Sequence, residues 1–148
     1  MPLKKTLQYL EENFKQANEA ANRLNISFER CKDFINNADF TEEQLIELEA
    51  LKARFARVSD LLIQKIFKTI DQLDASAPGT IRDRILQAEK KGLIQDADTL
   101  LEIRNVRNTI AHEYESMDIK EMFLFVFRHA QVLISVLSNA KQYAQKFY

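Results

Sequence analysis

The chain has 148 residues, a net charge of −1 and a sequence pI of about 6.2, with only two glycines and two prolines. This length fits one domain, residues 1–148. The composition favours an all-α fold and disfavours a loop-rich or β fold. The near-neutral charge means that the chain lacks the overall positive charge of many nucleic-acid binders. With one cysteine and two histidines, the chain is predicted to form no intrachain disulfide, no zinc site and no other metal site.

The first predicted helix carries an apolar seam with alternating spacings of four and three residues, and it is expected to end near Asn25. Ser27 is the predicted N-cap of a short second helix over residues 28–37, followed by a turn at 36–39. The near-3.5 period suits packing against antiparallel neighbours in a bundle. The seam consists of Leu3, Leu7, Leu10, Phe14, Ala17, Ala21 and Leu24.

Thr41 and Gln44 fit a capping box at the start of a long helix that is expected to reach Leu73. At 1.5 Å per residue this helix would be about 50 Å long, so we expect a kink or break whose position the pattern does not fix. Residues 74–79 are the clearest predicted loop in the chain.

Thr80 is the predicted cap of a short helix over residues 81–91, which Gly92 closes. Basic residues gather on this segment, and acids alternate with them. They are either an approach surface for nucleic acid or an ordinary solvated helix face. The four cations are Arg82, Arg84, Lys90 and Lys91.

The next helix is expected to begin at Asp96 or Asp98, where acids suit the positive end of the helix dipole, and to run to about Tyr114. Asp118 with Glu121 resembles a further capping box. The last helix is predicted over residues 119–147. Its run at 123–127 is apolar on every side, which indicates a central core helix or a subunit interface.

The segment from Leu101 to Glu115 concentrates the polar chemistry of the chain. Residues three and four apart share a helix face, so Arg104, Asn108 and His112 form one stripe, and Arg107 and Tyr114 lie on the next. Arg107 and His112 are five residues apart, about 140° around the axis. A fixed positive charge beside a group that titrates near pH 7 suits a phosphodiester substrate.

The string R-N-T-I-A-H-E-Y, residues 107–114, resembles the signature of the HEPN superfamily: Arg, a polar residue, spacers and then His. The added Tyr resembles the HepT toxins, the RNase halves of HepT/MntA toxin–antitoxin pairs. The close match covers residues 104–114. The resemblance implies an antiparallel up-and-down helical bundle with one or two short extra helices.

The resemblance also implies metal-independent RNA cleavage without a cofactor. Arg107 and His112 would be catalytic: the guanidinium would offset phosphate charge, and the imidazole would move the proton. Asn108 would orient His112 or contact phosphate, unless it is simply exposed. Arg104 would add a second cation or form a surface ion pair with neighbouring acids.

One histidine does not readily act as base and acid at once, and His129 is expected to have a packing role. The resemblance therefore implies a homodimer that brings two copies of the site together over an RNA substrate. It also implies an MntA-like nucleotidyltransferase antitoxin that adds AMP to Tyr114, placing an anionic group near Arg107.

Two other interpretations stay open. One is a HEPN helical adaptor without catalysis that binds a nucleotidyltransferase or a nucleotide. The other is a plain helical interaction module with a coincidental motif. The N-terminal segment lacks an apolar h-region and no run of about eighteen apolar residues occurs, so we expect a cytoplasmic protein outside the membrane.

Overall fold

The computed structural model describes residues 2–112 and 118–148. Within these ranges all regular structure is helical and no strand occurs, which confirms the all-α prediction. The elements are α1 (Leu3–Cys31), α2 (Glu42–Asp60), η1 (Leu61–Ile66), α3 (Phe67–Leu73), α4 (Ile81–Lys90), α5 (Ala97–His112), α6 (Ile119–Ala144) and η2 (Gln145–Phe147).

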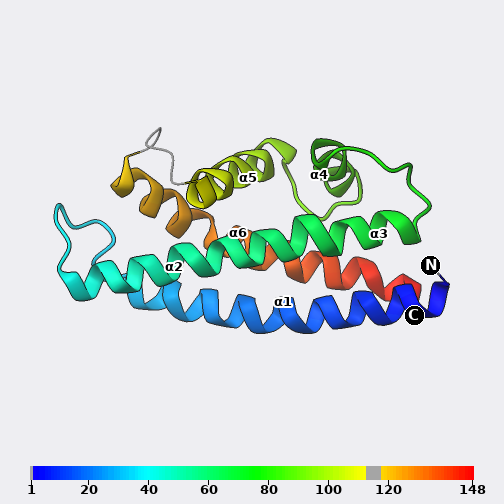
Figure 1. Cartoon of the computed structure of the whole chain (residues 1–148), viewed down its shortest axis with the longest axis horizontal. Coiled ribbons are helices and arrows are strands. Elements are labelled where there is room, and N and C mark those ends of the chain that lie inside the picture. The colour runs from blue at the N-terminus through cyan, green and yellow to red at the C-terminus, as the bar shows by residue number, and fades with distance from the viewer. Residues whose placement is uncertain (1, 113–117) are drawn as a thin grey trace.

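The long helices form a bundle in which each reverses the direction of the one before it (Figure 1). α1, the continuous rod of α2, η1 and α3, and α6 lie along one another, and α4 and α5 lie along one flank of this group. The two termini lie at the same end of the molecule (Figure 1). α2 has α1 on one side and α5 on the other, and this arrangement positions the site described below.

The first helix is longer than the sequence predicted. α1 continues through Asn25 to Cys31, so the prediction of a helix end near Asn25, a cap at Ser27 and a separate helix over 28–37 is wrong. Ser27 is fully buried, and its Oγ accepts a hydrogen bond from Nη1 of Arg54 at 2.8 Å. This contact with α2 satisfies the hydroxyl inside the helix, where local sequence alone favoured a cap.

The rod of α2, η1 and α3 begins as predicted and runs to Leu73, with a π-helical turn within the stretch where the sequence suggested a kink or break. Gln44 N donates to Thr41 Oγ1 at 3.1 Å, and Thr41 N donates to the Gln44 side chain at 3.0 Å, which completes the capping box. The helix widens into a π-helical turn at η1. There the carbonyl of Ile63 accepts a hydrogen bond from Nη1 of Arg84 at 3.0 Å.

Both predicted ends of α4 are confirmed. Thr80 and Asp83 form a reciprocal capping box. Gly92 has φ of 76°, its N–H donates to the carbonyl of Glu89, and Leu93 N donates to the carbonyl of Ala88. This pair of bonds is the Schellman motif, and a residue with a Cβ would be strained at the glycine position.

The last helix begins at its predicted cap, since Asp118 accepts a hydrogen bond from Lys120 N at 2.8 Å, but the described residues do not form the reciprocal capping box predicted with Glu121. α6 and η2 together reach Phe147, as predicted. Among the described helices, this one alone is long and apolar enough to cross a membrane by length and composition. Core helices of soluble proteins pass the same test.

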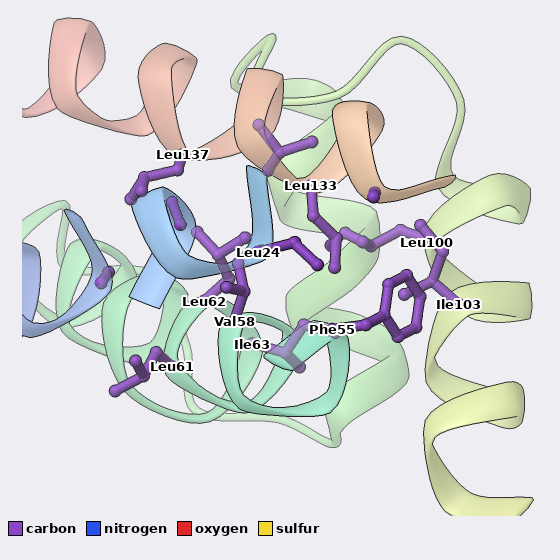
Figure 2. Close-up of a cluster of buried hydrophobic side chains, with 14 of the residues drawn as sticks. Leu24, Phe55, Val58, Leu61, Leu62, Ile63, Leu100, Ile103, Leu133 and Leu137 are labelled. Carbon is purple, nitrogen blue, oxygen red and sulfur yellow. The ribbon is translucent and has the colours of Figure 1, made fainter. Parts of the chain in front are cut away.

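The core fixes α5 to the bundle. Figure 2 shows Phe55 of α2 beside Leu100 and Ile103 of α5, and these three side chains are fully buried. Burying an apolar side chain of this size contributes about 1.5–3 kcal/mol. The labelled cluster draws on four helices and η1: Leu24, Phe55, Val58, Leu61, Leu62, Ile63, Leu100, Ile103, Leu133 and Leu137.

Candidate functional site

α5 carries the candidate residues, and its start is held by side chains from two elements. Asp96 Oδ1 accepts from Asp98 N at 3.0 Å, and Glu89 Oε2 accepts from Ala97 N at 2.7 Å. Carboxylates here satisfy N–H groups that have no partner within the helix. The helix therefore begins at the acidic segment, as predicted.

Three of the candidate polar residues of α5 lie at the edge of its buried face, between the core and solvent. Leu100, Ile103 and Val106 are buried at spacings of three, whereas Arg104, Arg107 and Asn108 are half-buried. A half-buried long side chain keeps its stem against apolar surface and its charged head near solvent.

Arg107 forms a bidentate ion pair with Asp60, the last residue of α2. Nε donates to Oδ1, and Nη2 donates to Oδ2 at 2.6 Å. The hydrogen bonds from Arg107 to Asp60 raise the pKa of the guanidinium further above its usual value, although burial acts in the opposite sense. The Arg107 side chain is 23% exposed and that of Asp60 is 31% exposed, so solvent reaches the pair.

Sequence reasoning missed Asp60. It lies 47 residues before Arg107 and carries no local signal, because it reads as an ordinary polar residue in a long helix. The pairing uses one edge of the guanidinium, formed by Nε and Nη2. Within the part of the chain that the structure describes, Nη1 makes no hydrogen bond.

Arg104 lies one turn before Arg107 on α5, so the two cations are neighbours along the helix. Among residues 2–112 and 118–148, no carboxylate lies within 4 Å of the Arg104 guanidinium, so the predicted surface ion pair is not formed there. Asn108 is half-buried beside Arg107 and is not simply exposed. The structure thus pairs Arg107 with the missed carboxylate of Asp60, while Arg104 and Asn108 lie on the same helix without a hydrogen bond or ion pair to that pair among the described residues.

Two predicted site residues fall at the edge of the described chain. His112 is the last residue of α5, and its side chain is outside the described part. Tyr114 lies outside the described residues altogether. The relation between the imidazole, the phenol and Arg107 therefore stays a prediction.

His129 has the predicted packing role. Its Nδ1 donates to the carbonyl of Phe125 at 2.8 Å, and its ring stacks on the Phe125 ring with centroids 3.9 Å apart. With Nδ1 bonded one turn back along α6 and the ring half-buried, His129 is held as a structural residue.

The basic segment of α4 is largely committed to internal contacts. Arg84 donates to the carbonyl of Ile63, and Lys91 pairs with Asp71 and Asp74 with only 9% of its side chain exposed. Arg82 and Lys90 are exposed. Because two of the four cations are used internally, these contacts favour the ordinary solvated helix face over an approach surface for nucleic acid.

The described residues do not include a cluster of three His, Cys, Asp or Glu side chains placed to hold a metal ion. Cys31 is fully buried in the core, and burial together with the charge of Glu47 raises the pKa of its thiol to about 11. The thiol is protonated at neutral pH, so it is not a nucleophile in the folded protein.

A scan of protein-family models and searches of curated proteins and of solved structures found no significant match to this chain. The HEPN resemblance therefore depends on the close match over residues 104–114 and on the all-helical character of the chain.

Proposed function

We propose that the protein is a metal-independent endoribonuclease of the HEPN type, acting as the toxin of a toxin–antitoxin pair. The observation that carries the proposal is Arg107. Its guanidinium is held by Asp60 through one edge, is partly open to solvent, and lies on the helix that ends at His112. A fixed arginine is suited to a phosphate that gains negative charge in the transition state.

In this mechanism the ribose 2′-oxygen attacks the adjacent phosphorus. A bond forms between the 2′-oxygen and phosphorus while the bond from phosphorus to the 5′-oxygen breaks, leaving a 2′,3′-cyclic phosphate and a 5′-hydroxyl. One His112 accepts the 2′-hydroxyl proton, and a second imidazole donates a proton to the leaving 5′-oxygen. Arg107 offsets the charge on the phosphate oxygens, and Asn108 and Arg104 orient or assist at the same phosphate.

The second imidazole comes from a homodimer in this proposal, because His129 is occupied in packing. Two copies of α5 would then face one RNA linkage. An MntA-like nucleotidyltransferase antitoxin would silence the site by adding AMP to Tyr114, since the added phosphate competes with RNA for the same arginine. Intact-mass and peptide analysis after incubation with that enzyme and ATP checks for AMP on Tyr114.

The test compares wild type with Arg107→Ala and His112→Ala on labelled RNA in the presence of EDTA. We expect cleavage by wild type with 2′,3′-cyclic phosphate ends. A loss of about 100-fold or more is expected for each variant, because each removes a group that acts in the transition state. A 2′-O-methyl RNA of the same sequence is the matched control and should stay intact. Equal rates for all three proteins would contradict the proposal.

The second candidate function is a non-catalytic helical adaptor that binds a nucleotidyltransferase or a nucleotide. A specific observation favours it: Asp60 already neutralises Arg107 and links α2 to α5, so the pair also serves as a structural contact. The adaptor hypothesis predicts that wild type does not cleave RNA. It also predicts that Arg107→Ala binds the transferase as tightly as wild type does.

A further inference from the structure

A second concentration of arginines lies in a groove between α1 and α2. The groove has a volume of about 480 Å³. Its lining is Gln16, Glu19, Ala20 and Arg23 from α1, and Ala53, Arg54 and Arg57 from α2. Three guanidinium groups therefore share the groove with one carboxylate, in a chain whose net charge is −1.

The three arginines are held differently. Arg54 is anchored across the two helices, because its Nη1 donates to Ser27 Oγ at 2.8 Å and to the carbonyl of Arg23 at 3.2 Å. Arg23 and Arg57 are exposed, and no carboxylate of the described residues lies within 4 Å of either guanidinium. The groove thus combines one fixed cation with two that are available to an anion.

The stripe of α2 that lines the groove also carries the partner of the candidate arginine. Ala53, Arg57 and Asp60 are four and three residues apart, so they follow one stripe of the helix. Asp60 is the partner of Arg107, and α2 lies between α1 and α5 (Figure 1). Arg57 therefore lies one helical turn before Asp60, the partner of Arg107. The axes of packed helices are about 8–10 Å apart, so a ligand in the groove would lie close to Arg107 on α5.

We propose that this arginine groove binds the phosphate backbone of single-stranded RNA next to the linkage held at Arg107. The inference rests on the proposed ribonuclease function and names the surface that holds its substrate. Arginine binds phosphate oxygens bidentately, and such contacts position a nucleic acid without reading its sequence. The groove lining has no aromatic side chain for base stacking, so the contact is with the backbone.

The experiment measures binding of the double variant Arg23→Gln with Arg57→Gln to a fluorescent 2′-O-methyl RNA, which cannot be cleaved by 2′-oxygen attack. The matched control is Arg82→Gln with Lys90→Gln, which removes the same charge from the exposed face of α4. We expect the groove variant to raise Kd about tenfold at low salt. Its plot of log Kd against log salt should lose about 1.4 in slope, about 0.7 for each lost phosphate contact. The control should stay within about twofold of wild type, because it keeps both groove cations.

The outcomes separate the two proposals. Equal loss of affinity in both variants overturns the groove assignment, and so does wild-type affinity in the groove variant. The assignment is also overturned if the groove variant binds RNA with wild-type affinity but no longer binds an acidic protein partner. If wild type binds RNA through the groove but Arg107→Ala leaves cleavage unchanged, the ribonuclease mechanism fails while the groove stands. All four arginine and lysine positions are exposed, and thermal melts should confirm that each variant is folded.

Discussion

Two ionic contacts between helices differ in their exposure to solvent. The closed cluster joins the ends of α3 and α4 to α6 and η2: Lys91 pairs with Asp71 and with Asp74, and Tyr143 and Lys146 also bond Asp74. The side chain of Lys91 is 9% exposed. The open pair joins α2 and α5 through Asp60 and Arg107, whose side chains are 31% and 23% exposed.

The difference lies in how many donors of each cation are used inside the protein. In the closed cluster the ammonium of Lys91 faces two carboxylates and the hydroxyl of Ser76, so its donors are used inside the protein. In the open pair one edge of the guanidinium is used and solvent reaches both partners. We therefore expect the closed cluster to contribute more to stability than the open pair, whereas the proposed ribonuclease function depends on the open pair.

The largest effect on stability is expected from Lys91→Met, with Arg107→Met as the matched comparison, because both changes keep an apolar stem and remove the charge. Removing Lys91 leaves carboxylates with little solvent and should cost about 2–3 kcal/mol of unfolding free energy. Removing Arg107 should cost no more than about 1 kcal/mol, because water can solvate Asp60. Denaturant unfolding of the two variants measures this order, and a reversed order would remove the distinction between the clusters.

A smaller effect is expected from the pH dependence of the closed cluster. Burial would raise the pKa of Asp74, but hydrogen bonds from Tyr143, Lys146 and Lys91 lower it below its ordinary value of 3.8. A lowered native pKa means that the stabilisation is present above the unfolded pKa and is lost as pH falls through the native value. Unfolding free energy should therefore fall below about pH 4, and Asp74→Asn should flatten this fall. An unchanged acid limb in the variant would exclude Asp74 as its source.

The smallest effect is expected at the turn that presents Lys91 to the closed cluster. Gly92→Ala should cost about 1 kcal/mol, because φ of 76° is strained for a residue with a Cβ, although no atom lies within 4 Å of the new methyl group. Gly92→Asn is the control and should cost less, since Asn tolerates this region better. Thermal unfolding of both variants checks the difference, and equal losses would point to a cause other than backbone strain.

Local signals in the sequence predicted most helix ends. Thr41, Thr80 and Asp118 cap helices as expected, and Gly92 closes α4. Each of these features depends on residues within one turn of one another, so a short string contains the whole interaction. The prediction failed at Ser27, whose hydroxyl is satisfied by Arg54 from another helix.

The candidate site was predicted only in part. The spacing of Arg104, Arg107 and Asn108 on one helix follows from the helical repeat, and the structure keeps these residues at the rim of the core. Asp60 and the arginine groove were not predicted, because they join segments far apart in the chain. Arg84 and Lys91 of the predicted basic cluster make internal contacts that were not predicted either, because their partners are also distant in the sequence.

By itself the sequence determined that the chain is helical, where most of its helices begin, and that α5 carries a cation-rich polar stripe. Those properties follow from caps, propensity and periodicity within a few residues. Only the tertiary structure decided which charges are enclosed and which face solvent. That outcome depends on which helices pack together. The packing of α2 with α5 pairs Asp60 with Arg107, although the two residues are 47 positions apart in the chain.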